Sequence, residues 1–244
     1  MNYLKEFNIN GFFIKKKFFK KKIIKKIIFE IFANKKSTKY FDNSNKLRRI
    51  ERLYNGGPGL RKINSILLNF LKQIFYCEYQ IFKDKFNAKP PGGEGFSAHY
   101  DGIFNFKDKN DIIKNGWYEY SNNFINILIA LDPCNKMNGT IEIAKIHNDS
   151  FNNLLKNTYQ NGTPLIRSEI EKKIKFKKIF LKPGDIVVFS NLCPHRSKKN
   201  ISKKERKTLY YTYTSNSKNN IYKKYFIDKK YSKNKTDKSL SGAT

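Results

Sequence analysis

Side chains that form disulfides or hold metal ions are scarce in this sequence. Among 244 residues there are three cysteines, Cys77, Cys134 and Cys193, and no two of them lie close together in the chain. An odd number at wide spacing argues against a disulfide framework and a zinc site, and it favours a reducing, cytoplasmic environment. Histidine is equally scarce. It occurs at positions 99, 147 and 195, so a metal site that uses imidazole has to draw on those residues.

Acidic residues and arginine are also few. Lysine and arginine together number 50 against 20 acidic residues, for a formal net charge of +30, yet only seven of the 50 are arginine. Lysine, asparagine and isoleucine are abundant throughout, as an AT-rich coding sequence would produce. Phosphate and base recognition favour arginine, and no nucleic-acid motif accompanies the charge. We therefore expect no specific nucleic-acid partner, while an anionic-membrane partner and the attraction of an anionic substrate are alternative explanations.

Long apolar runs are absent as well. We expect no signal peptide, because the first apolar run is too short and no small-residue cleavage site follows it, and we expect no transmembrane segment. Residues 18–33 repeat apolar pairs at helical spacing with lysines opposite, which predicts an amphipathic helix. Such a helix could lie on an anionic membrane, but packing on the protein's own core is the better explanation. Apolar positions between 60 and 74 predict a second core-facing helix.

The stretch Phe96-Ser-Ala-His99-Tyr-Asp101-Gly102 carries the clearest chemical pattern. His99 and Asp101 are two residues apart, so in an extended strand both side chains point to the same face. An imidazole nitrogen and a carboxylate oxygen on one face form half of a metal site. A second histidine would complete the two-histidine, one-carboxylate set of non-haem Fe(II) oxygenases, which leaves positions open for substrate and oxygen.

His195 has the context of that second histidine. It follows a predicted buried strand, Ile186 to Phe189, which comes after the turn residues Pro183-Gly184. Ser197 lies two residues further on, and Arg206 lies eleven residues past His195, just before the next apolar run. A His-x-Asp pattern alone occurs by chance in many chains. Together with a distal His-x-Ser and a following arginine it is much more specific.

These residues resemble the phytanoyl-CoA dioxygenase family, over residues 78 to 230. Further matching features are the run from Lys83 to Gly93 before the first candidate ligands and Asn200-x-Ser202 before Arg206. The segment from Leu209 to Lys230 is similar to a branch of small-molecule hydroxylases that includes 2-aminoethylphosphonate dioxygenases. The resemblance implies a double-stranded β-helix of the jelly-roll, cupin-like kind, mainly β with flanking helices.

The resemblance also implies a 2-oxoglutarate-dependent dioxygenase that hydroxylates a small, polar or anionic molecule and releases succinate and CO2. Fe(II) would be held by His99, Asp101 and His195, with O2 as co-reactant and ascorbate as a stimulant. Arg206 would pair with the far carboxylate of 2-oxoglutarate through its two-pronged guanidinium, and Ser197 would donate a hydrogen bond to the same carboxylate. The other residues expected at the cosubstrate pocket are Gln80, Lys89 and Trp117.

Two nearby residues are alternatives as metal ligands. Family members often carry Pro-Gly-Ser-His where this chain has Ala144-Lys-Ile-His147, so the histidine is retained and the turn is lost. We expect a structural or substrate-contacting role for His147 rather than metal ligation. Cys193 is two residues from His195, but a soft thiolate suits iron oxygenation poorly, so a buried thiol is expected there.

The length suits one domain with a sizeable core, and no repeat or linker divides the chain. We expect residues 1–75 to supply a strand and buttressing helices of the same domain, residues 76–232 to form the catalytic β-helix, and residues 233–244 to be a flexible tail. Residues 148–178 look like an insertion, partly helical and basic, that caps the mouth of the barrel and helps to choose the substrate. Strands are expected at 79–82, 86–89 and 124–131, and loops at 34–58 and 103–123.

Two other functions stay open from the sequence alone. One is a non-catalytic β-helix domain that serves as a binding module, against which the complete ligand set with Ser197 and Arg206 speaks. The other is a basic protein associated with nucleic acid or membrane, in which the β-helix is incidental. The sequence indicates neither the oligomeric state nor the identity of the substrate.

Overall fold

The computed structural model describes residues 2–108, 110–159, 161–215 and 220–231. Its helices are α1 (Tyr3–Asn10), α2 (Lys21–Ala33), α3 (Pro58–Phe75), α4 (Phe151–Lys156), α5 (Ser168–Glu171), α6 (Ile221–Tyr231) and the 3-10 helix η1 (Gly116–Glu119). Its strands are β1 (Phe12–Lys15), β2 (Thr38–Phe41), β3 (Leu47–Glu51), β4 (Gln80–Lys89), β5 (Phe96–His99), β6 (Phe106–Lys107), β7 (Ile113–Lys114), β8 (Ile125–Ala130), β9 (Ile141–Ile143), β10 (Lys177–Lys178), β11 (Ile186–Ser190), β12 (His195–Ser197) and β13 (Arg206–Thr214).

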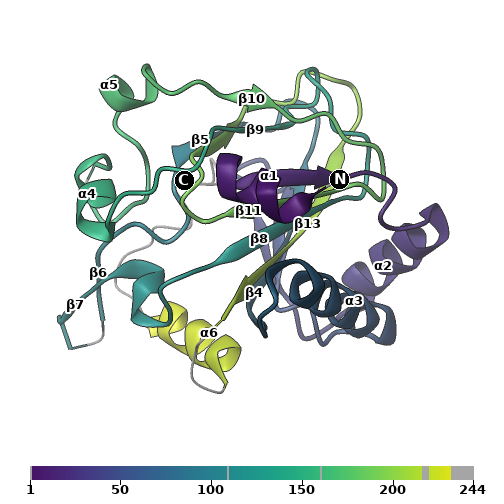
Figure 1. Ribbon diagram of the computed structural model, residues 1–244. Coiled ribbons are helices and arrows are strands. Elements are labelled where there is room, and N and C mark those ends of the chain that lie inside the picture. The colour runs from purple at the N-terminus through teal and green to yellow at the C-terminus, as the bar shows by residue number, and fades with distance from the viewer. Residues whose placement is uncertain (1, 109, 160, 216–219, 232–244) are drawn as a thin grey trace.

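Two antiparallel sheets face each other across a shared apolar core (Figure 1). The large sheet has the order β1-β11-β8-β13-β4-β3-β2, the small sheet has the order β10-β9-β12-β5, and β6 pairs with β7 separately. Side chains of β8 and β11 meet side chains of β9 between the sheets. From β8 onward the chain passes back and forth between the two sheets. This is a double-stranded β-helix, and the expected fold class is confirmed.

Strand β8 is almost entirely apolar because both of its faces are buried. Alternate residues from Ile125 to Ile129 belong to the core beneath the helices, while Leu128 and Ala130 belong to the core between the sheets. A strand that is buried on both faces needs apolar residues at almost every position. Asn126 is the single polar residue of β8, and it lies on the face that points to the small sheet.

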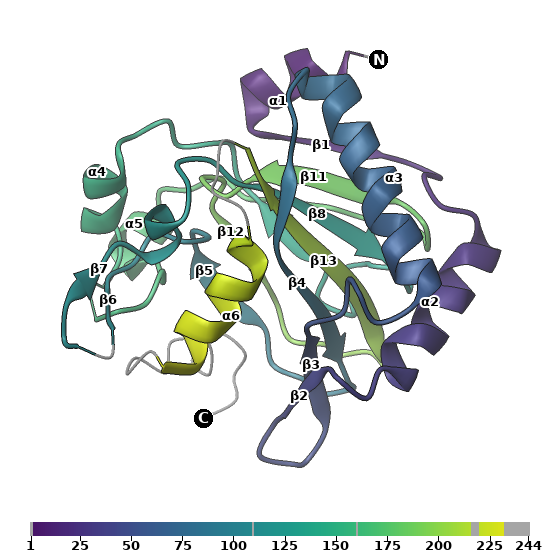
Figure 2. The same ribbon diagram turned by 90° about the horizontal axis from the view of Figure 1, so that it is seen from below.

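Helices α1, α2 and α3 cover the outer face of the large sheet (Figure 2). In α2 and α3 the apolar residues that recur at helical spacing point to the sheet. The lysines of α2 are exposed. The buried apolar residues are Ile24, Ile27, Ile31, Leu60, Ile63, Leu67 and Leu71. Both predicted core-facing helices are therefore confirmed. Within the described residues, no helix combines the length and the apolar character that crossing a membrane requires.

A buried carboxylate joins α2 to α3. The two carboxylate oxygens of Glu30 accept hydrogen bonds from the backbone N–H groups of Gly59 and Leu60, both at 2.9 Å. These N–H groups lie in the first turn of α3, where they have no partner within the helix, and the residue preceding α3, Gly57, offers no side-chain cap. An added Cβ at Gly57 or Gly59 would meet the Glu30 carboxylate at 2.5 or 2.7 Å. The close approach explains glycine at both positions.

The loop predicted at residues 34–58 is wrong, because β2 and β3 lie within it and pair as a hairpin. β3 also pairs with β4 and so extends the large sheet. The charged residues Arg48 and Arg49 made the segment look solvent-exposed, yet both are buried. Arg48 forms an ion pair with Asp42 and Arg49 forms one with Glu51, each at 3.6 Å. The segment predicted as a loop at 103–123 likewise contains β6, β7 and η1.

The two strands predicted at 79–82 and 86–89 are one continuous strand, β4. The charged residues between them suggested a break. Asp84, however, is buried and accepts hydrogen bonds from the backbone N–H groups of Leu53 and Tyr54 at 2.9 and 2.8 Å. Because these bonds satisfy the carboxylate, the strand carries a charged residue through the sheet without interruption.

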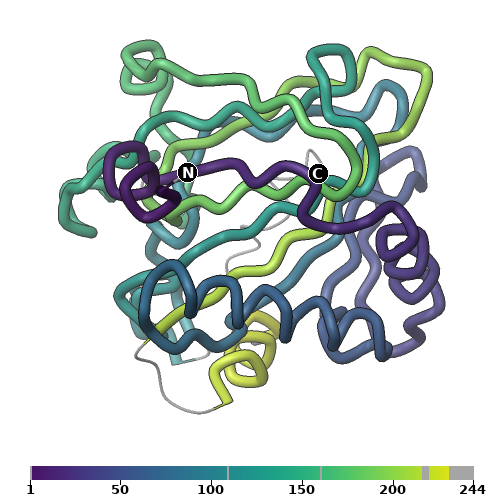
Figure 3. Tube along the Cα trace, turned by 45° about the vertical axis from the view of Figure 1, so that its right-hand side comes forward, coloured from purple at the N-terminus to yellow at the C-terminus, as the bar shows by residue number. Residues whose placement is uncertain are grey.

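The N-terminal part of the chain is built into the large sheet. β1 pairs along its whole length with β11, as the purple and green segments of Figure 3 show, and β2 and β3 lie at the opposite edge. On this basis we propose that residues 1–75 belong to the same domain as residues 76–232. The tail expected to be flexible, 233–244, lies outside the residues that the structure describes.

Replacing Glu30 with alanine tests the link between α2 and α3. We expect Glu30→Ala to lower the free energy of unfolding by about 2 kcal/mol, because the N–H groups of Gly59 and Leu60 lose a charged acceptor. Chemical denaturation measures this change. Glu78 forms an exposed ion pair with Lys72, so Glu78→Ala is a matched control that should cost less than about 1 kcal/mol. Equal losses in the two variants would contradict the capping role.

Candidate metal centre

The structure brings His99, Asp101 and His195 together. His99 ends β5, His195 begins β12, and the two residues are direct partners across the small sheet. All three side chains are buried, and their candidate ligand atoms lie within 4.8 Å of one another. The His195 Nε2 atom lies 3.7 Å from the Asp101 Oδ2 atom, and the two imidazole rings have centroids 4.1 Å apart. Among the described residues no other group of histidine, cysteine and acidic side chains has this arrangement.

One detail of the prediction is wrong. Strand β5 ends at His99, so Asp101 lies in a bend rather than in the same extended strand. Its backbone is held by Asn191, whose carbonyl oxygen accepts from the Asp101 N–H at 3.1 Å and whose side chain donates to the Asp101 carbonyl at 3.2 Å. These bonds turn the carboxylate toward His195 even though the strand has stopped.

Backbone carbonyl groups fix the tautomer of both histidines. The Nδ1 atom of His99 lies 2.7 Å from the Ser97 carbonyl oxygen, and that of His195 lies 3.0 Å from the Cys193 carbonyl oxygen. A carbonyl only accepts, so each Nδ1 carries the proton and each Nε2 keeps a lone pair. Burial, followed by the neighbouring His195, lowers the pKa of His99 to about 3, and burial lowers the pKa of His195. Both rings are thus neutral, as metal ligands must be.

The carboxylate ligand is oriented by a polar pair inside the large sheet. The side-chain amide of Asn126 donates to Asp101 Oδ2 at 2.9 Å, and the hydroxyl of Thr212 donates to the Asn126 amide oxygen at 2.7 Å. The Thr212 bond therefore decides which end of the amide faces the carboxylate. Burial raises the pKa of Asp101, but His195, once protonated at low pH, and the ammonium groups of Lys85 and Lys83 outweigh it and bring the pKa to about 2. The carboxylate is ionised and ready to bind a cation.

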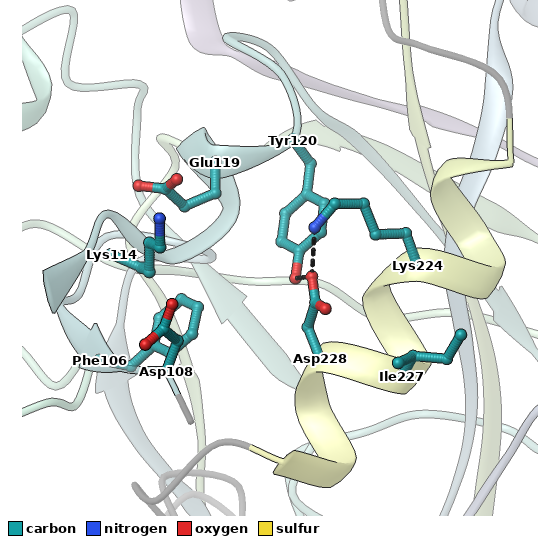
Figure 4. Close-up of a pocket in the computed structure, with 8 residues that line it drawn as sticks. All are labelled: Phe106, Asp108, Lys114, Glu119, Tyr120, Lys224, Ile227 and Asp228. Atoms are coloured by element: carbon teal, nitrogen blue, oxygen red, sulfur yellow. Dashed lines mark hydrogen bonds and ion pairs between the residues drawn. The ribbon is translucent and has the colours of Figure 1, made fainter. Parts of the chain in front are cut away.

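A small cavity of about 30 Å³ opens beside the two histidines. Its lining residues are Lys85, Asn87, Phe96, His99, Ile141, His195, Arg196, Ser197, Arg206 and Tyr210. A larger cavity of about 570 Å³ lies between η1, the β6–β7 hairpin and α6 (Figure 4). None of the three candidate ligands lines the larger cavity. The smaller cavity is lined by His99, His195 and the buried Arg206.

Arg206 lies at the edge of the cavity with an unsatisfied guanidinium. It is buried, its Nη1 atom donates a 3.4 Å hydrogen bond to the Thr208 hydroxyl, and its Nε atom has no hydrogen-bond partner. Within the described residues no carboxylate lies within ion-pair distance of it. A buried guanidinium without a counter-charge is costly unless a ligand supplies one. The geometry fits a carboxylate that enters the cavity from solvent.

Ser197 and Lys89 lie next to Arg206. Lys89 is buried, and its Nζ atom donates to the Ser197 hydroxyl at 2.8 Å and to two backbone carbonyls. The Phe96 N–H also donates to that hydroxyl, at 3.3 Å. Because the Ser197 oxygen accepts twice, its own hydrogen is left to donate into the cavity. Burial, together with the charges of Arg206 and Arg48, lowers the pKa of Lys89 to about 6. An anion in the cavity would relieve this repulsion.

Two predicted cosubstrate residues lie elsewhere. Gln80 is at the opposite end of β4 from Lys89 and pairs with Thr214, so it does not line the small cavity. Trp117 is buried against Phe82 and Phe124, and its ring is not among the cavity-lining residues. The bulky aromatic cluster around it explains its position. The expectation that Gln80 and Trp117 face the cosubstrate pocket is not supported.

The structure adds residues that sequence reasoning missed. Lys85, Asn87 and Tyr210 line the cavity, and Asn126 orients the carboxylate. The available signal was the alternation of β4, in which every second residue, from Lys83 to Lys89, is polar. Alternate residues of a strand share one face, so this pattern marked the polar interior of the barrel.

His147 does not join the metal candidates. Its Nδ1 atom lies 2.7 Å from the Tyr100 hydroxyl, and the two side chains are joined by this hydrogen bond. Cys193 is also outside the group, and burial raises the pKa of its thiol to about 12. Both alternatives for a ligand are thus disfavoured, as the sequence predicted.

The segment 148–178 packs along the free edge of β5. Leu165 forms a bridge with His99, and the Ile166 N–H donates to the Ala98 carbonyl at 2.8 Å. Arg196 of β12 donates to Glu171 of the same segment at 2.6 Å. The segment therefore lies beside two metal-ligand strands. Its predicted role in choosing the substrate stays a prediction.

The model of one protein family matches most of the chain, over residues 17–208, and its description is phytanoyl-CoA dioxygenase (PhyH). The chain belongs to the phytanoyl-CoA dioxygenase family. It is 29% identical over 153 residues to a methylphosphonate hydroxylase of Gimesia maris, a match that covers 62% of this chain and 52% of the relative. It is 26% identical over 201 residues to a 2-aminoethylphosphonate dioxygenase of an uncultured bacterium, which covers 79% and 70%. The chain thus spans only about half the length of the first of these relatives.

Solved structures share the fold at low identity. EctD from S. alaskensis, solved with 2-oxoglutarate and 5-hydroxyectoine, superposes with a TM-score of 0.63 at 15% identity over 87% of this chain and 74% of its own. The epimerase SnoN, solved with Fe3+, alpha ketoglutarate and nogalamycin RO, superposes with a TM-score of 0.65 at 13% identity over 87% and 82%. Both likenesses support the double-stranded β-helix fold of this family member.

Removing one candidate ligand tests the metal centre. We expect His99→Ala and Asp101→Ala each to lower Fe(II) affinity by at least about 100-fold, since even outer-shell partners of metal ligands are worth 10- to 100-fold. Iron content after anaerobic loading and desalting measures this, and circular dichroism verifies the fold. Iron retained in full by either variant would show that the ligand set is wrong.

The third histidine, His147, provides the control for these ligand substitutions. We expect His147→Ala to keep its iron and measurable activity, because His147 contacts Tyr100 and lies outside the ligand group. The lost hydrogen bond should cost about 1 kcal/mol of stability, which thermal melting detects. Iron falling to background in this variant would identify His147 as a ligand.

Proposed function

We propose that the protein is an Fe(II)- and 2-oxoglutarate-dependent dioxygenase that hydroxylates a small, polar or anionic molecule. The observation that carries the proposal is one cavity lined both by the two histidines of the ligand group and by a buried arginine that has no carboxylate partner among the described residues. Membership of the phytanoyl-CoA dioxygenase family supports it. A non-catalytic binding module would have no need of a complete, pre-oriented ligand set.

His99, Asp101 and His195 would hold the iron through two Nε2 atoms and a carboxylate oxygen, a donor set that suits Fe(II) and leaves positions for other ligands. When bound, the iron with 2-oxoglutarate and O2 supplies the oxidising chemistry that inserts a hydroxyl group and yields succinate and CO2. The chain's own contribution is orientation. Carbonyl groups hold the rings, and Asn126 holds the carboxylate.

Arg206 and Ser197 would bind the far carboxylate of 2-oxoglutarate, and Lys89 would hold Ser197 in place. The Arg206 guanidinium provides the charge and a two-pronged donor. The Ser197 hydroxyl donates beside it, because Lys89 and the Phe96 N–H already occupy its oxygen. Lys89 thus acts on the cosubstrate through Ser197, as a positioning residue. Phe96 and Ile141 supply the apolar part of a cavity wall that is otherwise mostly polar.

The names of the relatives and the net charge of the chain support a small anionic substrate. The two relatives described above are named for methylphosphonate and 2-aminoethylphosphonate, so a small phosphonate is the first candidate for this chain. The formal net charge of +30 favours the approach of any anion. We propose a cytoplasmic location, which three free cysteines support.

A coupled assay tests the proposed function. Purified protein is incubated with Fe(II), ascorbate and 2-oxoglutarate, and succinate is measured with and without methylphosphonate or 2-aminoethylphosphonate. The proposal expects succinate that depends on iron and rises with a substrate. Absence of iron-dependent succinate under every condition would contradict it.

Arg206 provides a sharper prediction about the cosubstrate. We expect Arg206→Ala to raise the KM for 2-oxoglutarate by about 30-fold or more, because truncating one partner of a buried charged pair costs at least about 2 kcal/mol. Arg206→Lys should recover part of the loss, since an ammonium cannot form the fork. Steady-state kinetics with varied 2-oxoglutarate measures both.

Exposed lysines near Arg206 give the control. Lys203→Ala and Lys204→Ala remove the same charge from the surface and should change the KM little. If all these substitutions have equal effects, diffuse positive charge rather than a specific clamp attracts the cosubstrate.

A further inference from the structure

Helix α2 exposes two phenylalanines on the side that faces away from the core. Phe29 is 73% exposed and Phe32 is 43% exposed, although the opposite side of the same helix is buried on the large sheet. Phe32 still packs against Phe86, with ring centroids 5.4 Å apart. Single exposed apolar residues are common on protein surfaces, so the neighbours of the two rings decide what they mean.

The neighbours of the two rings are lysines. Lys25 and Lys26 precede Phe29 by four and three residues, the spacings at which side chains on a helix surface are adjacent. Lys22 lies one turn before Lys26 on the same side, and all three lysines are exposed. The outward face of α2, made of these three lysines with Phe29 and Phe32, therefore combines positive charge with aromatic rings.

The segment that carries this face does not balance its charge. Residues 15–39 contain eleven lysines, no arginine and one acidic residue, Glu30. Glu30 is buried, and its two oxygens accept the hydrogen bonds from Gly59 and Leu60. Within the described residues no carboxylate lies within ion-pair distance of a lysine of α2. The outward face of α2 thus presents its positive charge to solvent.

The composition of the face selects one kind of anionic partner. Recognition of nucleic acid favours arginine, which this segment lacks. A lipid surface with negative headgroups attracts clustered lysines, and aromatic rings enter the boundary between its headgroups and acyl chains. α2 has 13 residues, which corresponds to a length of about 20 Å. A flat surface can therefore contact all of its outward side chains at once.

The position of α2 leaves the candidate metal centre uncovered. The helix lies at the edge of the molecule in two perpendicular views (Figures 1 and 2). It covers the outer face of the large sheet, whereas the small cavity is lined from β4, β5, β12 and β13 on the other side of that sheet. A surface that contacts α2 does not close the cavity.

We propose that the outward face of α2 binds an anionic phospholipid membrane. Lys22, Lys25 and Lys26 contact the phosphate headgroups, and Phe29 and Phe32 insert between the lipids. The inward face remains on the large sheet, so packing on the core and contact with a membrane are compatible roles of one helix. The inference goes beyond the proposed function and does not depend on it, because neither metal nor cosubstrate takes part.

Vesicle flotation tests the proposal with the full chain. The protein is mixed at physiological salt with vesicles of phosphatidylcholine that contain phosphatidylserine, and with vesicles of phosphatidylcholine alone. We expect it to float with the anionic vesicles and not with the neutral ones, and added salt should weaken the binding by screening the charges. Absence of binding to the anionic vesicles would overturn the proposal.

Substitution of the three lysines measures their contribution. The triple variant Lys22→Gln/Lys25→Gln/Lys26→Gln should bind anionic vesicles about 100-fold more weakly, since one lysine near such a surface contributes about fivefold. The corresponding triple arginine variant should bind like the wild type, because it keeps the charge. Circular dichroism verifies that both variants are folded. Wild-type binding by the glutamine variant would contradict the proposal.

A matched triple variant controls for net charge. Lys172, Lys173 and Lys175 are exposed and follow α5, which lies far from α2 in both views (Figures 1 and 2). Lys172→Gln/Lys173→Gln/Lys175→Gln removes the same charge and should bind anionic vesicles nearly as well as the wild type. Equal losses in the two glutamine variants would show that overall charge, not the outward face of α2, is responsible.

Phe29 tests whether the face inserts into lipid. Phe29→Gln should weaken vesicle binding about tenfold or more, because an aromatic side chain no longer leaves water. The single tryptophan of the chain, Trp117, is buried, so Phe29→Trp adds a separate fluorescent reporter. Its emission should shift to shorter wavelength with anionic vesicles and be quenched by lipids with brominated acyl chains. An unchanged emission, or full binding by Phe29→Gln, would overturn insertion.

Duplex DNA separates a membrane from a nucleic acid as the partner. We expect DNA binding to fall no more in the α2 glutamine variant than in the matched control variant, since the chain as a whole is basic. If the three lysines of α2 are required for binding DNA and not for binding anionic vesicles, the face serves a nucleic acid and the proposal is overturned.

Discussion

The pairing of β5 with β12 is the constraint on which the site depends. It makes His99 and His195, which are far apart in the chain, direct partners in the small sheet. Burying two imidazoles beside a carboxylate is costly unless each polar atom is satisfied. Here backbone carbonyls accept hydrogen bonds from the Nδ1–H groups, and the Asn126 amide donates one to an oxygen of Asp101. The two Nε2 atoms and a carboxylate oxygen remain available, and they lie within 4.8 Å of one another. A metal ion bound between them would satisfy all three.

The large sheet meets two opposite demands because strand residues alternate. Its outer face is apolar and packs against α2 and α3, whereas its inner face carries the polar residues of β4 and β13. One strand pair thus carries Arg206 and Lys89, two residues of the proposed cosubstrate site, as direct partners. The apolar outer face provides the stability that allows unsatisfied groups such as the Arg206 Nε inside.

The sequence predicted those features that depend on local spacing. The His-x-Asp and His-x-Ser patterns located the ligand group and Ser197, and helical periodicity located α2 and α3. It failed where burial depends on distant partners. The β2–β3 hairpin looked like a loop because the ion pairs that allow Arg48 and Arg49 to be buried are not visible in the pattern. Gln80 was misplaced for a similar reason, since its position depends on the full length and register of β4.

The central claim is that a single Fe(II) ion and 2-oxoglutarate bind together in the small cavity. An anaerobic titration tests it most directly, because chelation of Fe(II) by a 2-oxo acid gives a visible charge-transfer absorption that neither component gives alone. The account predicts an absorption that needs iron, cosubstrate and protein together and that saturates at one iron per chain. An absorption that fails to appear, or that saturates only at several irons per chain, would contradict it.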